Sequence, residues 1–259
     1  MKLEQNPFTQ SLAKGEKQVG LWVSLSSPFS AELIAHAGYD WALVDMEHAP
    51  NDYFSVLGQL QAFAASKTTA IVRPEWNDPV VVKRLLDLGA QGLLFPMIQN
   101  VEEAKKAVAS TRYPPHGNRG VSAATRATKF GRVTDYIDRV DDEMAVLLQL
   151  ETVAALDKSE EIGAVKGVSG IFFGPADIAA DMGKVGKTMD ADVWDKIRQT
   201  AKKLIAMGIP VGTLVLDPDL AAELINDGFT FVACGSDISL LAKSSDALLA
   251  NVKGKIDEC

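Results

Sequence analysis

The sequence predicts an α/β fold in which eight parallel strands, each followed by a helical segment, close into a (β/α)8 barrel. Eight short runs of nearly continuous apolar residues alternate with amphipathic segments, as expected for parallel strands covered on both faces. The length of 259 residues suits such barrels, which typically contain about 250 residues. No shift in composition marks a second domain, so we expect one barrel domain spanning residues 1–259.

The predicted strands and helices alternate along the chain. Two of the predicted helices end at Gly38 and Gly89, which favours a helix C-terminus. Several others begin after Asn or Asp, which cap a helix N-terminus. The strands cover residues 18–25, 40–47, 68–74, 92–97, 145–151, 167–175, 209–217 and 229–235. The helical segments cover residues 30–38, 78–89, 101–110, 190–208, 218–228 and 238–252.

One irregular stretch, residues 111–135, interrupts this alternation. It contains the run YPPHGNRGVSAATRATKFGRV. Loops of this length are usually functional or disordered. Because it follows the fourth strand, we expect it on the barrel face where loops build active sites.

Composition excludes several classes of function. The net charge is −8, with 26 basic and 34 acidic residues and no basic run, so a nucleic-acid partner is not expected. The N-terminal segment lacks the apolar core of a signal peptide. No apolar run reaches the roughly 18 residues of a membrane span, and we expect a cytoplasmic protein. Cys234 and Cys259 do not indicate a disulfide framework, and Cys234 is predicted to be a small buried core residue.

Polar side chains gather where the predicted strands end. Catalytic groups of such barrels come from the C-terminal ends of the strands, so this is where we expect the site. Residues two apart in a strand point to the same side. By this rule Gln149 shares a side with Glu151, and Asp45 shares a side with Glu47. The polar residues at or just past these strand ends are Asp45, Glu47, His48, Arg73, Gln149, Glu151 and Asp177.

Glu151 and Asp177 form a candidate metal pair. Two carboxylates on adjacent strands can bind one hard cation and leave positions for water and substrate. All-oxygen ligation favours Mg²⁺ or Mn²⁺ over Zn²⁺. Alternatively, Glu151 caps a helix and Asp177 is a first-turn residue stabilised by the helix dipole. Spacing alone leaves both interpretations open.

Two further side chains are candidates for chemistry. His48 could be an acid or base, or a surface histidine. Arg73 could bind a carboxylate or stabilise an enolate oxygen, or form a salt bridge at the barrel rim. His36, expected within a helix, and His116, in a turn, are interpreted as structural. No lysine lies in a predicted strand, so a Schiff-base lysine on a barrel strand is not expected.

The sequence resembles the class II pyruvate aldolases of the 4-hydroxy-2-oxoheptanedioate aldolase family, also called the HpcH/HpaI family. The resemblance covers nearly the whole chain and implies a (β/α)8 TIM barrel of the phosphoenolpyruvate/pyruvate-domain type. The runs that carry it are GLWVSLSSPFSAELIAHAGYDWALVDMEHAPND, VRPEWNDPVVVKRLLDLGAQGLLFPMIQNVEEA, TRYPPHGNRGVSAATRAT, LLQLET and FFGPADIAADMG.

The resemblance implies a chemical role for the residues at the strand ends. Glu151 and Asp177 would ligate a divalent metal (Mg²⁺, Mn²⁺ or Co²⁺) that chelates the 2-oxo acid. Arg73 would stabilise the enolate oxygen alongside the metal. His48 would be the base, directly or through a metal-bound water, and Asp45 would support the site from behind.

The resemblance also implies how the substrate is held. The backbone around Gly174, Pro175 and Ala176 would meet the substrate carboxylate at a helix N-terminus, which suits an anion. Gln149 would help to hold the bound substrate, and Trp22 would line the pocket.

The resemblance implies a role for Asp87 that depends on a second subunit. Asp87 sits at a helix end and is not expected to reach the mouth of its own barrel. In the family the matching aspartate comes from a neighbouring subunit and raises the basicity of the histidine. The resemblance therefore implies an oligomer, typically a homohexamer built as a trimer of dimers with the last helix exchanged between subunits.

The resemblance therefore implies a metal-dependent lyase that reversibly cleaves 4-hydroxy-2-oxo acids to pyruvate, or hydroxypyruvate, and an aldehyde. Two alternatives stay open, a thioester lyase of the citrate-lyase beta type and a non-catalytic protein that binds 2-oxo acids. The thioester lyase needs room for coenzyme A, and the sequence shows no basic patch for it.

Overall fold

Eight parallel strands form a closed barrel in the computed structural model, which describes residues 1–257. Neighbouring strands pair in chain order, and the first strand closes the ring by pairing with the last. All eight predicted strands are confirmed, with small changes at their ends. They are β1 (Gln18–Val23), β2 (Trp41–Asp45), β3 (Thr69–Arg73), β4 (Gly92–Phe95), β5 (Ala145–Leu150), β6 (Gly170–Phe173), β7 (Val211–Val215) and β8 (Phe231–Ser236).

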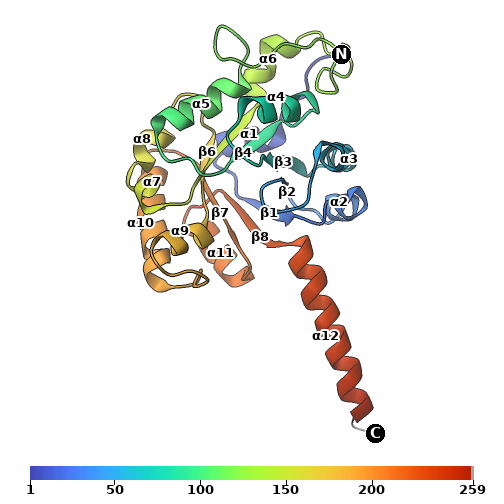
Figure 1. Cartoon of the computed structure of the whole chain (residues 1–259), viewed down its shortest axis with the longest axis vertical. Coiled ribbons are helices and arrows are strands. Elements are labelled where there is room, and N and C mark those ends of the chain that lie inside the picture. The colour runs from blue at the N-terminus through green and yellow to red at the C-terminus, as the bar shows by residue number, and fades with distance from the viewer. Residues whose placement is uncertain (258–259) are drawn as a thin grey trace.

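Helices connect the strands around the outside of the barrel (Figure 1). The six predicted helices are confirmed as α2 (Pro28–Ala35), α4 (Pro79–Asp87), α5 (Val101–Thr111), α10 (Ala191–Ala206), α11 (Pro218–Asn226) and α12 (Asp237–Asp257). The glycines after α2 and α4 have positive φ angles of 96° and 94°, as their predicted place at helix ends requires.

Other helices lie outside these six segments. They are α1 (Pro7–Lys14), α3 (Tyr53–Phe63), α6 (Tyr136–Glu143), α7 (Val153–Asp157), α8 (Ser159–Gly163) and α9 (Pro175–Asp181). The last of them, α9, begins just before Asp177, where a helix start was expected. The signals for α1 and α3 were present in the sequence. Asn6 caps α1 and is followed by Pro7, while Asp52 and Ser55 form a capping box at the start of α3.

The N-terminal end of the barrel is filled by aromatic rings. Phe8 of α1 lies with its ring centroid 5.9 Å from Trp41 and 5.7 Å from Phe231, at edge-to-face angles. Gly20 makes room for this layer, because a Cβ atom there would lie 2.2 Å from the Trp41 ring. Burying such a side chain typically contributes about 1.5–3 kcal/mol, so α1 closes this end as a hydrophobic plug.

The irregular stretch does not lie where we expected it. It follows α5 rather than strand β4, so it runs along the N-terminal end of the barrel, opposite the strand ends. Its backbone there bonds to the start of the chain, Thr134 N to Met1 O at 3.0 Å, and to the end of α4, Ala127 N to Asp87 O at 3.2 Å. Figure 1 shows the chain start beside α6. The prediction that this loop helps to build the barrel mouth of its own chain is therefore wrong.

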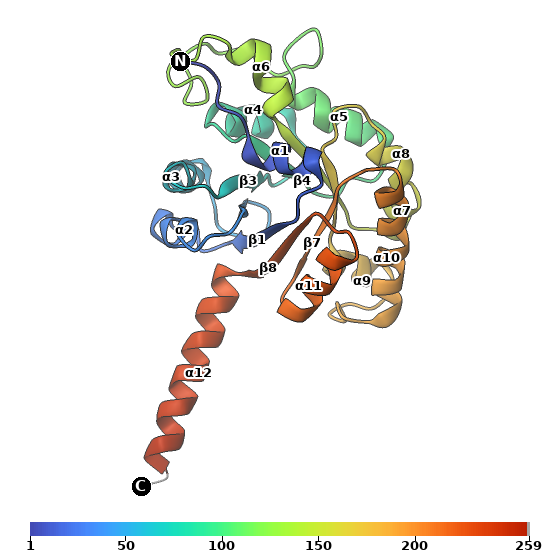
Figure 2. The same ribbon diagram turned by 180° about the vertical axis from the view of Figure 1, so that it is seen from behind.

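Helix α12 leaves the barrel and extends away from it in both views (Figures 1 and 2). It carries large apolar side chains that are exposed in the single chain, Leu240, Leu241, Leu248, Leu249, Val252 and Ile256. Such an exposed apolar set marks a surface for association. In the described part of the chain, none of the helices has the length and apolarity to cross a bilayer.

The cysteines, His36 and His116 are not among the residues of the predicted site. Cys234 packs against the core but is half-buried rather than buried, while Cys259 lies outside the described residues. His36 is the exposed residue that ends α2, not a mid-helix residue. His116 is exposed, with Nδ1 3.7 Å from an Asp141 carboxylate oxygen.

Candidate active site

A buried arginine at the end of β3 organises the C-terminal end of the barrel. Arg73 pairs in register with Asp45 of β2. Its Nε donates to Asp45 Oδ1 at 2.8 Å and its Nη2 donates to Asp45 Oδ2 at 2.7 Å. Trp22 of β1 contacts this pair as well, because its Nε1 donates to Asp45 Oδ2 at 3.2 Å. The Trp22 ring centroid lies 5.0 Å from Arg73 Cζ.

The charge on this pair is well defined. Burial alone would raise the pKa of Asp45, but the hydrogen bonds and charge of Arg73 outweigh it and hold that pKa below its usual value. Hydrogen bonds to Asp45 use two of the five guanidinium donors of Arg73. Donors therefore remain on both terminal nitrogens, where a substrate oxygen can be bound.

The turn after β2 is built on the Asp45 carboxylate as well. Asp45 Oδ1 accepts a hydrogen bond from Glu47 N at 3.0 Å and from His48 N at 3.4 Å. The side chain of Asn51 donates back to the Asp45 carbonyl. The His48 side chain is 67% exposed in the single chain, and its Nε2 lies 3.9 Å from Glu47 Oε2. Asp45 therefore sets the path of the backbone that presents His48.

Glu151 lies buried just past the end of β5. Its Oε1 accepts from Gln149 Nε2 at 2.6 Å, which confirms that these two side chains share a side. Its Oε2 accepts from Met97 N at 2.7 Å. In the described chain, no ion pair joins Glu151 to a lysine, arginine or histidine. Burial raises the pKa of Glu151 to about 7; the Met97 N–H opposes the shift, and the charges of Glu47 and Asp177 add to it.

Asp177 lies in the first turn of α9, the helix that follows β6. It is exposed, and its charge raises the pKa of both Glu47 and Glu151. Gly174 just before it must lack a side chain, because a Cβ atom there would lie 2.9 Å from Glu151 Oε1. Three carboxylates thus lie close enough to affect one another's charge.

This arrangement fits a hard divalent cation. Glu151 is buried without an ion-pair partner in the described chain, and the charge of Asp177 helps to raise its pKa. The buried Gln149 Oε1 has no hydrogen-bond partner. Among residues 1–257, no group of three or more His, Cys, Asp or Glu side chains is placed to hold a metal ion. Mg²⁺ is commonly held by one or two carboxylates and keeps positions for water and substrate. The two carboxylates present are enough for that mode of binding.

Some polar residues do not belong to this cluster. Asp181 accepts a hydrogen bond from Val153 N at 2.8 Å and so has a structural contact. Asp87 ends α4 at the opposite end of the barrel, as expected from its place in the sequence. There its Oδ1 accepts from Nη2 of the buried Arg119 at 3.1 Å.

Sequence reasoning left two contributors without a role. Glu47 was placed on the same side as Asp45, and the structure confirms this, because both contact Arg73. Its place between Arg73 and His48 could not be read from alternation alone. Met97 contributes a backbone N–H, with a positive φ of 53°, and no residue type signals such a contact.

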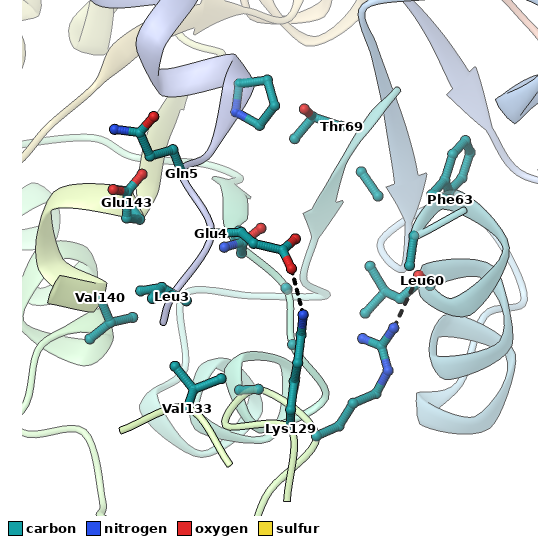
Figure 3. Close-up of a pocket in the computed structure, with 18 of the residues that line it drawn as sticks. Leu3, Glu4, Gln5, Leu60, Phe63, Thr69, Lys129, Val133, Val140 and Glu143 are labelled. Atoms are coloured by element: carbon teal, nitrogen blue, oxygen red, sulfur yellow. Dashed lines mark hydrogen bonds and ion pairs between the residues drawn. The ribbon is translucent and has the colours of Figure 1, made fainter. Parts of the chain in front are cut away.

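A large cavity lies elsewhere, at the N-terminal end of the barrel (Figure 3). It has a volume of about 770 Å³ and lies among the start of the chain, α3, α6 and the loop before α6. Lys129 Nζ and Glu4 Oε1 form an ion pair of 2.6 Å at its edge. None of the predicted site residues lines it. The candidate site is therefore identified by converging charges and not by cavity volume.

Comparison with known proteins gives a consistent result. A family model described as HpcH/HpaI aldolase/citrate lyase matches residues 18–244. A pyruvate aldolase of Rhizobium etli is 49% identical over 96% of this chain and 98% of its own length. A 4-hydroxy-2-oxo-heptane-1,7-dioate aldolase of Escherichia coli is 47% identical over 95% of this chain and 94% of its own.

The fold can also be compared with that of a solved structure. An HpcH/HpaI aldolase/citrate lyase family protein from Burkholderia cenocepacia superposes with a TM-score of 0.93 at 38% identity. The match covers 96% of this chain and all of the other.

Proposed function

The chain belongs to the HpcH/HpaI aldolase/citrate lyase family and is an aldolase, and from this premise we propose that it reversibly cleaves 4-hydroxy-2-oxo acids to pyruvate and an aldehyde. The observation that carries the proposal is the juxtaposition of two opposite electrostatic features at one barrel end. Arg73 offers unused N–H donors to a developing oxyanion. Glu151 and Asp177 offer uncompensated negative charge to a cation.

The family implies a divalent metal cofactor, and Glu151 and Asp177 are the residues that would hold it. When bound, the cation would act as a Lewis acid toward the carboxylate and keto oxygens of the 2-oxo acid. We propose Mg²⁺, Mn²⁺ or Co²⁺, since the available ligands are oxygens.

The side chains around that pair supply binding and orientation. Gln149, which already contacts Glu151, would hold the substrate through its unpaired Oε1 or its amide group. The Gly174, Pro175 and Ala176 segment would lie along the substrate carboxylate, where the absence of a Cβ atom at Gly174 keeps space open. Trp22, which packs beneath Arg73, would form the floor of the pocket.

Proton transfer is assigned to His48 and charge stabilisation to Arg73. In the synthetic direction His48 takes a proton from the C3 methyl group of pyruvate, and Arg73 donates hydrogen bonds to the resulting enolate oxygen. C3 then forms a bond to the aldehyde carbon as the aldehyde C=O π bond opens, and the aldehyde oxygen takes the proton that His48 carries. In cleavage His48 takes the proton of the 4-hydroxyl group, the C3–C4 bond breaks, and His48 returns that proton to C3. Asp45 holds Arg73 in the required orientation throughout.

A second copy of the chain is proposed to complete the site. His48 is exposed in the single chain, and Asp87 lies at the opposite barrel end, where it cannot reach His48 of its own chain. We propose that Asp87 of a neighbouring subunit approaches His48 and raises its basicity. The exposed apolar side chains of α12 support an exchange of this helix between subunits in a homohexamer, a trimer of dimers.

An aldol assay tests the proposed function. Pyruvate and hydroxypyruvate would each be incubated with succinic semialdehyde, lactaldehyde or glyceraldehyde and a divalent metal, and the products identified by NMR. We expect 4-hydroxy-2-oxo acids to form, chelator to stop the reaction, and borohydride with pyruvate to leave activity intact. Borohydride inactivation would point to a lysine Schiff base instead. Activity only with coenzyme A thioesters would support the thioester-lyase alternative, and pyruvate binding without turnover would support the binding-only alternative.

A further inference from the structure

Glu47 makes contacts that none of the assigned roles explain. Its side chain is only 12% exposed, and its Oε2 is 2.8 Å from Arg73 Nη1. The same oxygen is 3.9 Å from His48 Nε2. A single carboxylate oxygen therefore lies between the proposed oxyanion donor and the proposed base.

Charge balance at Arg73 does not require Glu47. Asp45 already binds the guanidinium through two hydrogen bonds, an arrangement that satisfies both charges. The carboxylate of Glu47 is an additional negative charge near Asp45 and Asp177. Burial, opposed by the charges of Arg73 and His48, raises the pKa of Glu47, and those two neighbouring carboxylates raise it further. A side chain placed at such a cost points to a role in the chemistry.

The location of Glu47 also explains what it could do. Asp45 binds Arg73 through Nε and Nη2, and Glu47 forms an ion pair with the remaining nitrogen, Nη1. This contact is not a hydrogen bond, so the donors of Nη1 stay available. His48 has no hydrogen bond from its ring to another side chain of the described chain, and Glu47 is the acidic group beside it. Glu47 therefore contacts the guanidinium of Arg73 and lies beside the imidazole of His48.

We propose that Glu47 is a positioning residue that holds Arg73 and His48 at a fixed separation and balances the charge of His48 when the imidazole carries the substrate proton. This inference rests on the proposed function, because it takes His48 as the base and Arg73 as the oxyanion donor. Glu47 acts through these two side chains and does not itself take the proton from the substrate.

The test uses the full-length protein with Glu47→Gln and Glu47→Ala, and measures exchange of the pyruvate methyl protons in D₂O. Gln keeps the size of the side chain but removes its charge, so we expect normal thermal stability. Because positioned proton transfer typically contributes about 10²–10⁴ in rate, we expect the exchange rate of the Gln variant to fall by about 10- to 100-fold. The concentration of pyruvate that gives half-maximal exchange should change by less than about 3-fold, since Glu47 is not a substrate ligand.

Chemical rescue separates the charge of Glu47 from its packing. The Ala variant leaves space at a site that is partly open to solvent, which a small carboxylate can enter. We expect formate to restore part of the exchange rate of the Ala variant, and neutral formamide, of similar size, to leave it unchanged. Glu75→Gln is the matched control, because it removes an exposed carboxylate at the same end of the barrel, and its exchange rate should equal that of the wild type.

The outcomes separate this inference from the proposed function. A wild-type protein that does not exchange the methyl protons refutes the proposed function before any variant is considered. A wild-type protein that exchanges, together with a Gln variant of equal rate, overturns the role of Glu47 alone. Equal rescue by formate and formamide would also overturn it, because that result assigns Glu47 to packing.

Discussion

The two ends of the barrel are built from the same strands but differ in the side chains that those strands bury. At the N-terminal end the rings of Phe8, Trp41 and Phe231 pack edge to face inside the barrel. At the C-terminal end the strands deliver Asp45, Arg73 and Glu151 into the interior, where burial raises the pKa of Glu151 to about 7. One end therefore stabilises the fold, while the other end holds buried charges in place at a cost in stability. Substitutions at the two ends should therefore separate stability from chemistry.

The largest effect is expected where both properties meet, at Asp45. Asp45→Asn leaves Arg73 buried without its carboxylate, and breaking a buried pair in this way typically costs about 3–5 kcal/mol. Because the folded pKa of Asp45 lies below its unfolded value of about 3.9, its contribution is present above that pH and is lost as the pH falls through the folded pKa.

Urea unfolding at several pH values measures this effect. The free energy of unfolding of Asp45→Asn should lie well below that of the wild type at pH 7, and the difference should shrink in acid. The exposed Asp195→Asn removes the same charge from α10 and should show no difference. A constant deficit at all pH values would contradict the assigned charge state of Asp45.

Phe8→Ala is expected to affect stability alone. Deleting a buried phenylalanine typically costs about 3–5 kcal/mol, because the cavity closes only in part. Activity per folded molecule should equal that of the wild type, since Phe8 lies at the end of the barrel opposite the site. Thermal unfolding and active-site titration together measure the two quantities. A stable variant with reduced turnover would contradict the claim that the N-terminal end of the barrel contributes to stability and not to chemistry.

Arg73→Lys is expected to affect chemistry more than stability. Lysine keeps the positive charge for Asp45 but lacks the planar fork that leaves donors free for the substrate. Loss of one oxyanion donor commonly costs about 10²–10³ in kcat. The control is Arg198→Lys on α10, whose guanidinium pairs with Glu223 and Asp227 at the surface. Near-normal kcat for Arg73→Lys would remove Arg73 from its proposed role.

Metal should stabilise the protein through Glu151. A ligand that binds only the folded state adds about 2.7 kcal/mol at about 100 times its Kd. Adding Mn²⁺ to chelator-treated wild type should therefore raise the melting temperature, and Glu151→Gln should abolish that increase. Metal-free Glu151→Gln should be no less stable than the metal-free wild type, because a buried carboxylate without a cation has been removed. Equal stabilisation of both proteins by Mn²⁺ would place the metal elsewhere.

Asp87→Asn is expected to give the smallest change, about a 10-fold loss of activity. Losses of this size are typical of residues that contact a catalytic group but not the substrate. If Asp87 acts on the His48 of a neighbouring subunit, co-assembly with inactive Arg73→Lys subunits should restore activity, because some sites then combine wild-type residues from both chains. Activity that equals the average of the two separate variants would show that Asp87 does not act across subunits.

The strands were predictable because each is a short, nearly continuous run of apolar residues. Such a run can be recognised in the sequence without knowledge of its partners in the fold. The place of the 111–135 stretch was not predicted correctly. The chain returns through α5 before that stretch begins, so the loop belongs to the opposite end of the barrel.

The candidate site was predictable in its residue types and less so in its contacts. Alternation placed Gln149 with Glu151 and Asp45 with Glu47. The hydrogen bond between Gln149 and Glu151 and the ion pairs of Asp45 and Glu47 with Arg73 agree with this. The bridging position of Glu47 depends on side-chain torsions and on the turn after β2. The Met97 N–H depends on a backbone angle. Neither leaves a signal in the order of residues.

The most direct test of the central claim is hydrogen exchange at the pyruvate methyl group, followed by NMR in D₂O with the wild-type protein. We expect exchange with added Mg²⁺ or Mn²⁺, loss of exchange with a chelator, and loss of exchange in Glu151→Gln. Exchange that continues in the metal-free protein or in Glu151→Gln would contradict the claim that Glu151 and Asp177 hold the metal this reaction requires.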